Sequence, residues 1–188
     1  MVFSGRVECE RPLRVGGGVG RWVLAALAVV GACSAPDPGE GPLLVDFGDE
    51  LADTHREVLF NATELELVAV DPAWPTPESV ADPATLHGYT VRGRAATSER
   101  EVRLELLEAL GAAARENDGM VAACFNPRHA LIAHHDGRTA ELIICFECLT
   151  FQVWDGAERV ETVDISDTPR GLFDRIFEEH GLSIAPGG

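Results

Sequence analysis

Residues 124–148 read CFNPRHALIAHHDGRTAELIICFEC and carry the strongest structural signal in the chain. Mostly apolar residues stand on both sides of the dipeptide Asp136-Gly137. An Asp-Gly pair supplies the two positive φ angles that a two-residue type I′ turn requires. We therefore expect an antiparallel hairpin, with one strand over residues 129–135 and the other over residues 138–154.

The turn also determines which residues face each other across this hairpin. Counting back from it places His129 opposite Ile144, and Arg128 then faces Cys145. Glu147 is the diagonal neighbour of Arg128 on the same face, within reach of a long side chain. The sequence therefore predicts an ion pair between Arg128 and Glu147 that holds the two strands in register.

The rest of the chain shows helix and strand patterns separated by short turns. Helices are predicted over residues 49–61, 99–116 and 169–180, and strands over residues 64–70, 86–96, 120–124 and 158–165. Consecutive strands joined by tight turns form antiparallel sheets. We expect an α+β domain: a mostly antiparallel sheet of about five to six strands, with two to three helices packed on one face.

The N-terminus has the features of an export signal. Arginines precede an apolar run at residues 22–30, and small residues follow it. This order is typical of a secretory signal peptide, which we assign to residues 1–32. The apolar run is well below the roughly 20 residues that a membrane-spanning helix needs.

The residues at the end of this signal resemble the bacterial lipobox. Val30-Gly31-Ala32-Cys33 ends in a cysteine, which in lipoproteins is acylated and becomes the first mature residue. We therefore predict lipidation of Cys33, with ordinary cleavage near Ala32 or an uncleaved anchor as the alternatives. The lipid would hold the protein at the bacterial cell envelope, facing the periplasm. Ser34, in place of aspartate, favours the outer membrane over the inner.

The composition of the mature chain indicates a tether followed by one domain, and its charge argues against some classes of partner. Residues 33–42 are rich in proline and glycine and are expected to form a flexible tether. Residues 43–185 suffice for one globular domain. The formal net charge of the chain is −16, which repels phosphate backbones and argues against nucleic-acid binding. Expected partners are the membrane, through the lipid, and a further envelope protein.

Cys124, His129, Cys145 and Cys148 form the main group of candidate functional residues, and zinc is one interpretation. The geometry of the expected hairpin opposes it. Residues three apart in a strand point to opposite faces, so Cys145 and Cys148 would diverge. Cys148 would also lie about 13 Å along the strand from the position opposite His129.

Three other interpretations of the cysteines stay open. A disulfide can join Cys124 to Cys145 or Cys148, whereas a bond between Cys145 and Cys148 requires a break in the strand. A catalytic cysteine thiolate could be activated by His129 and oriented by Glu147. Buried cysteines can also serve simply as small apolar residues, and this packing role is the one we favour.

Segments 86–89, 124–129 and 144–148, which read LHGY, CFNPRH and ICFEC, resemble a family of uncharacterised bacterial envelope lipoproteins. The resemblance implies a shared α+β domain and carries no established activity.

The motif search leaves a binding or structural role as the leading expectation. The sequence contains no phosphate-binding glycine loop, nucleophile elbow or HExxH motif. We therefore expect a non-catalytic envelope module without a cofactor, rather than an enzyme. The alternative is a zinc-binding or thiol-redox domain that uses Cys124, His129, Cys145 and Cys148.

Overall fold

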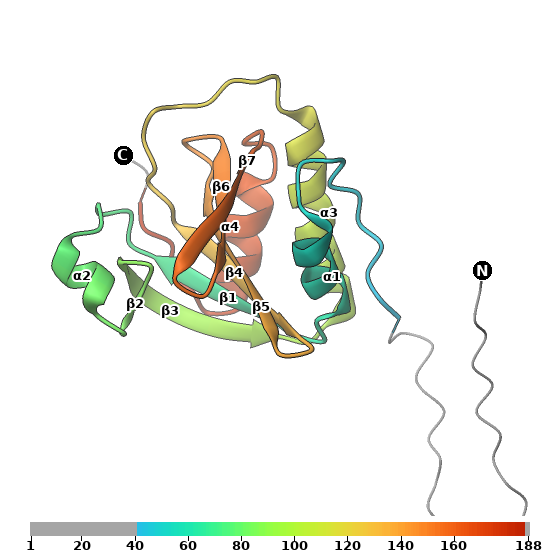
Figure 1. The fold of residues 1–188 in the computed structure, drawn as a ribbon, viewed down its shortest axis with the longest axis horizontal. Coiled ribbons are helices and arrows are strands. Elements are labelled where there is room, and N and C mark those ends of the chain that lie inside the picture. Colours follow the sequence, from blue (N-terminus) through green and yellow to red (C-terminus); the bar gives the residue numbers. More distant parts are fainter. Residues whose placement is uncertain (1–40, 187–188) are drawn as a thin grey trace, which may run out of the picture. The chain divides into compact units, whose positions relative to one another are not determined.

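The computed structural model describes residues 41–186, which all lie within one unit of the chain, Pro36–Gly188 (Figure 1). Its elements, in chain order, are α1 (Asp53–Asn61), β1 (Leu65–Val70), α2 (Pro77–Ala81), β2 (Thr85–Leu86), β3 (Tyr89–Thr97), α3 (Arg100–Glu116), β4 (His129–His135), β5 (Arg138–Cys145), β6 (Thr150–Asp155), β7 (Glu158–Asp164) and α4 (Arg170–Glu179). The predicted signal peptide, Cys33 and most of the tether fall outside the described residues. Within residues 41–186, no helix is long and apolar enough to cross a membrane.

The strands form one antiparallel sheet, so the expected α+β class is confirmed. The sheet has seven strands in the order β2-β3-β1-β4-β5-β6-β7, more than the five to six expected. Two predicted strands are each divided by a turn, one at His87-Gly88 and one at residues 146–149. The strand predicted over residues 120–124 is absent, because that segment is an irregular loop.

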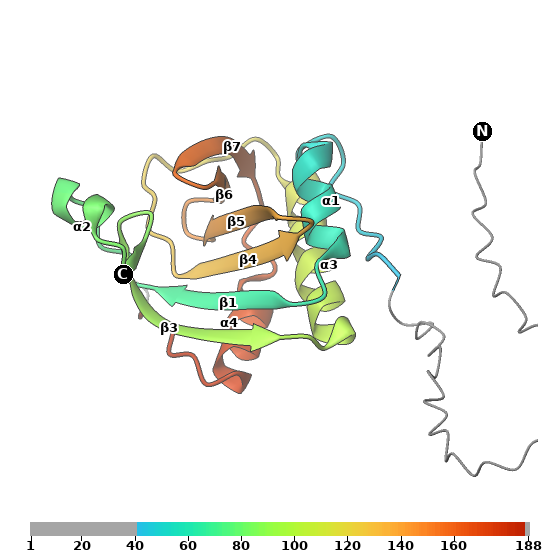
Figure 2. The ribbon, with the colours of Figure 1, turned by 60° about the horizontal axis from the view of Figure 1, so that its bottom comes forward.

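The larger hydrophobic core lies between one face of the sheet and three helices. α1, α3 and α4 each contribute buried side chains, among them Leu59, Leu107 and Phe173. α2 contributes none and lies at the end of the sheet away from α1 and α3 (Figure 2). The fourth helix therefore departs from the expectation of two to three helices on one face. It forms inside the proline-rich loop because Thr76 and Ser79 cap its start reciprocally.

The β4–β5 hairpin has the register that the Asp136-Gly137 turn predicts. Both turn residues have positive φ, 48° and 73°. His129 pairs with Ile144, as expected. Side chains alternate along these strands, so even one residue of slip would exchange the core-facing and outer-facing sets.

The outer face of the sheet, opposite the three helices, carries a smaller apolar cluster that includes Val68, Leu86, Tyr89 and Ile132. The sheet curls over this cluster. His87, in the β2–β3 turn, contacts Trp154 of β6, although four strands separate β2 from β6 in the sheet order. The β2–β3 turn therefore overhangs the outer face of β5 and β6.

Candidate functional site: a three-cysteine cluster

A tight turn at residues 146–149 separates β5 from β6 and brings Cys145 and Cys148 together. The N–H of Cys148 donates to the carbonyl oxygen of Cys145 at 3.2 Å, and Leu149 takes a positive φ of 58°. The Cα atoms of the two cysteines are 5.2 Å apart. The prediction of one continuous strand over residues 138–154 is therefore wrong, and so is the divergence of the two cysteines that followed from it.

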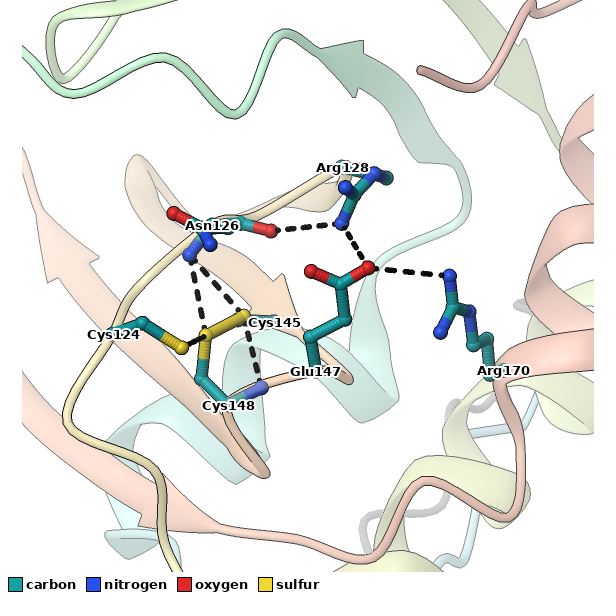
Figure 3. The surroundings of a disulfide bond; sticks show 7 residues. All are labelled: Cys124, Asn126, Arg128, Cys145, Glu147, Cys148 and Arg170. Atoms are coloured by element: carbon teal, nitrogen blue, oxygen red, sulfur yellow. Dashed lines mark hydrogen bonds and ion pairs between the residues drawn. A yellow bond between two sulfur atoms is a disulfide. The ribbon is translucent and has the colours of Figure 1, made fainter. Parts of the chain in front are cut away.

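Three sulfur atoms meet at this turn (Figure 3). Cys145 and Cys148 form a disulfide, and Cys124 has a free thiol. Sγ of Cys124 lies 3.2 Å from Sγ of Cys148. The exposed fraction is 1% for Cys145 and 0% for Cys148, whereas Cys124 is half-buried. The cluster is thus a buried disulfide with a more accessible thiol in contact with one of its sulfurs.

Backbone N–H groups surround the disulfide. The N–H of Asn126 points to both sulfurs, at 3.3 Å from Cys145 Sγ and 3.2 Å from Cys148 Sγ. The N–H of Cys148 lies 3.2 Å from Cys145 Sγ. Cys145 Sγ therefore accepts from two backbone donors. Such donors favour a negatively charged sulfur over a neutral one.

The loop that carries Cys124 is held on both of its sides. The N–H of Ala122 donates to the carbonyl oxygen of Cys148 at 3.2 Å. The Phe125 ring packs edge-on against Tyr89, with 6.2 Å between the centroids. These two contacts place Cys124 on the disulfide without a strand.

Arg128 and Glu147 connect the same loop to the turn. Nη1 of Arg128 lies 2.9 Å from Oε1 of Glu147, and Nη2 of Arg170 lies 3.5 Å from the same oxygen. The Arg128 guanidinium also donates to the carbonyl oxygens of Pro186, at 3.0 Å, and Asn126, at 3.3 Å. These contacts fix Asn126 relative to the turn, so that its N–H stays aimed at the sulfurs (Figure 3).

His129 is not part of the sulfur cluster. Its ring lies on the helix-covered face, edge-on to Phe146, Phe173 and Phe177. Nε2 of His129 is 2.9 Å from Oδ1 of Asp174 on α4. Burial lowers the pKa of His129 and outweighs the opposing effect of Asp174. The contact with His129 lowers the pKa of the Asp174 carboxyl. The two lowered pKa values therefore favour a neutral imidazole beside an ionised carboxylate.

The four residues considered as zinc ligands do not form one ligand set. The sulfurs of Cys145 and Cys148 are bonded to each other, and His129 contacts Asp174. Among residues 41–186, no group of three or more His, Cys, Asp or Glu side chains is arranged to hold a metal ion. The cofactor content of the protein stays a prediction.

A second polar group, which the sequence analysis did not identify, lies on the outer face of the sheet. Nε2 of His87 lies 2.5 Å from Oε2 of Glu141, and the His87 ring stacks on Trp154 with 3.9 Å between centroids. Gly88 was the available local signal, because glycine readily takes the positive φ of a tight turn, and it could indicate the turn alone. The partners lie 54 and 67 positions away in the chain and cannot be found from local pattern.

Comparison of the chain with protein-family models, with curated proteins and with solved structures finds no match. The resemblance to envelope lipoproteins therefore stays a prediction.

Proposed function

We propose that the domain is a thiol–disulfide exchange module of the bacterial cell envelope, facing the periplasm and tethered by a lipid on Cys33. The observation that supports this best is the 3.2 Å contact between the free thiol of Cys124 and Sγ of Cys148 in the disulfide. Disulfides exchange by attack of a thiolate on a disulfide sulfur, and this contact already brings the two reacting atoms together. An envelope location supplies an oxidising environment in which disulfides persist.

The first step is internal to the chain. Cys124 loses its proton, and its thiolate attacks Sγ of Cys148. A Cys124–Cys148 bond forms while the Cys145–Cys148 bond breaks, and the electron pair leaves on Cys145. The N–H groups of Asn126 and Cys148, 3.3 and 3.2 Å from Cys145 Sγ, stabilise this leaving thiolate. The step consumes no oxidant or reductant, because one disulfide replaces another.

The second step passes the disulfide to a partner. Cys145 and Cys148 are buried, so an incoming thiol reaches the cluster through half-buried Cys124. A partner thiolate attacks Cys124 Sγ, forms a mixed disulfide and releases Cys148 as a thiolate. A second thiolate of the partner then attacks the partner's sulfur in the mixed disulfide, forms the partner's own disulfide and releases Cys124 as a thiolate. The partner loses two electrons and two protons, Cys145 and Cys148 gain them and end as thiols, and the Cys124 thiol is restored. The partner class is a polypeptide with two neighbouring thiols.

The second candidate is the non-catalytic binding or structural module that the sequence favoured. The observation in its favour is the set of contacts that Arg128 makes with Glu147, Pro186 and Asn126, which would stabilise the turn whether or not its sulfurs react. In this candidate Cys124 contributes packing alone. The two candidates therefore differ in what its thiol does.

The decisive experiment compares the wild-type chain with Cys124→Ser during reduction of the Cys145–Cys148 disulfide by dithiothreitol. Thiols are trapped by alkylation at successive times and counted by intact mass spectrometry. We expect reduction to be about tenfold slower in the variant, because the reductant loses its accessible relay sulfur. Ala123→Ser is the matched control, since Ala123 is an exposed neighbour in the same loop. Equal rates in wild type and Cys124→Ser would reject the relay and leave the second candidate.

The proposed lipid anchor on Cys33 is tested separately from the cysteine chemistry. Intact mass spectrometry of protein purified from its membrane should show the mass of an acylated Cys33 as the first residue. An unmodified mature N-terminus would reject the lipid anchor and would leave the exchange chemistry of Cys124 unaffected.

A further inference from the structure

A groove runs along the outer face of the sheet, beneath the overhanging β2–β3 turn. Its volume is about 570 Å³, and an adjoining hollow of about 460 Å³ shares Glu66, Arg94, Ile132 and His134 with it. Ligand sites in proteins typically occupy about 300–1,000 Å³. The groove is thus large enough for a small organic molecule, and it is separate from the cysteine cluster.

The walls of the groove combine an apolar surface with one fixed polar pair. Val80, Leu86, Ile132 and Trp154 supply apolar side chains from α2 and from three strands. Such walls suit an aliphatic chain, because they remove it from water.

The polar pair, His87 with Glu141, is held against local backbone preference. His87 takes a φ of 50°, a left-handed conformation that costs a non-glycine residue about 1–2 kcal/mol. The next residue, Gly88, also has positive φ, so the turn itself could be built from two glycines. A strained backbone conformation at the wall of a cavity suggests that the side chain has a role there. Here that side chain reaches Glu141 and stacks on Trp154.

The groove carries more negative than positive side chains, which favours a cationic ligand. The residues that line the two hollows include four carboxylates, Glu64, Glu66, Asp82 and Glu141, and one guanidinium, Arg94. Nη1 of Arg94 lies 2.9 Å from Oε1 of Glu66, so it offsets one of the four charges. The side chains of Glu66 and Glu141 are 29% and 19% exposed, and partial burial strengthens their attraction for a cation.

We propose that this groove binds a small aliphatic amine, with its ammonium group at the carboxylate of Glu141 and its hydrocarbon chain on Ile132, Leu86 and Trp154. The proposal is independent of the exchange chemistry of the cysteines. It assigns a role to His87 as the residue that orients the Glu141 carboxylate at the groove wall.

The test uses three probes of equal chain length: pentylamine, 1-pentanol and pentanoate. Binding to the full chain is followed by NMR through the indole N–H signal of Trp154, which Trp154→Phe identifies. We expect pentylamine to shift this signal saturably and the neutral and anionic probes to leave it in place. Equal shifts by all three probes, or no shift by pentylamine, would overturn the proposal.

Variants then separate the groove from general attraction to an acidic protein. Glu141→Gln should weaken pentylamine binding by about tenfold, through loss of the charge-assisted contact. Arg94→Gln should tighten binding, because it removes the cation that opposes the ligand. Glu108→Gln, on the exposed side of α3, is the matched control and should change nothing. Equal weakening in Glu108→Gln and Glu141→Gln, or weaker binding in Arg94→Gln, would contradict a specific amine site.

Discussion

Two histidine–carboxylate pairs lie on opposite faces of the same sheet. On the helix-covered face, Nε2 of His129 is 2.9 Å from Oδ1 of Asp174. On the outer face, Nε2 of His87 is 2.5 Å from Oε2 of Glu141. The first histidine is enclosed by three phenylalanine rings. The second stacks on one face of Trp154 and borders an open groove.

Enclosure by neighbouring side chains, rather than residue type, therefore determines what such a pair can do. A buried imidazole cannot contact a ligand, so we expect it to affect only the free energy of unfolding. An imidazole at a groove wall can orient a carboxylate toward a ligand, and little stability depends on it.

The largest effect should come from the enclosure of His129. Phe173 is fully buried and packs edge-on against both His129 and Phe146. We expect Phe173→Ala to lower the free energy of unfolding by about 3–5 kcal/mol, because the helix-covered face cannot collapse into the cavity. Trp154→Ala, on the outer face, should cost clearly less, because the groove already admits water. Urea unfolding followed by circular dichroism measures both losses. Equal losses in free energy of unfolding would show that the two faces do not differ in this way.

Removing the sealed histidine should have the next largest effect. His129→Ala leaves a cavity among the phenylalanines and leaves the Asp174 carboxylate without the ring at 2.9 Å. We expect a loss of about 2–3 kcal/mol in the same urea experiment. Asp174→Asn is the companion variant. It should cost less, because the Asp174 side chain is 37% exposed and can be solvated. A loss in His129→Ala below that of Asp174→Asn would show that the ring is not tightly enclosed.

The dependence of stability on pH should arise from the same sealed pair. Burial holds the pKa of His129 below its ordinary value near 6.5 in the folded protein. The unfolded chain therefore binds more protons below that pH, and stability falls as the pH decreases. One proton contributes at most about 1.4 kcal/mol per pH unit. The lowered pKa of Asp174 adds stability above about pH 3.9 that is lost as the pH falls through its folded-state pKa.

The measurement is urea unfolding at a series of pH values between about 5 and 7, the range that the imidazole governs. His129→Gln should flatten the profile there. Phe177→Leu is the control, because it reduces packing around the ring without removing a titratable group. A profile as steep in His129→Gln as in wild type would assign the pH dependence elsewhere.

The sequence was sufficient where a local signal determined geometry. Asp136-Gly137 gave the β4–β5 register, down to His129 opposite Ile144. Both residues of this turn take positive φ, so the prediction did not depend on distant parts of the chain.

The sequence was insufficient where distant contacts overrode local preference. Residues 146–149 contain no glycine, proline, asparagine or aspartate, yet they form the turn that brings Cys145 and Cys148 together. Leu149 takes positive φ there, which a leucine does not favour. Cys124, Cys145 and Cys148 do lie together, whereas His129 does not, and the pairing of the cysteines depended on a turn that only tertiary packing specifies.

The smallest effect should come from the outer pair, and it tests the comparison most sharply. His87→Gly relieves a left-handed φ of 50°, a gain of about 1 kcal/mol, and loses the contact with Glu141, which is worth about the same. We expect the free energy of unfolding to change by less than about 1 kcal/mol while pentylamine binding weakens.

Gly88→Ala is the control in the same turn: the φ of Gly88 is 88°, and an added Cβ would lie 2.8 Å from Cβ of Pro75. It should destabilise the turn, because alanine is strained at that φ and the added atom has no space. If His87→Gly costs as much as His129→Ala, both pairs are structural, and the outer groove loses the residue that orients its carboxylate.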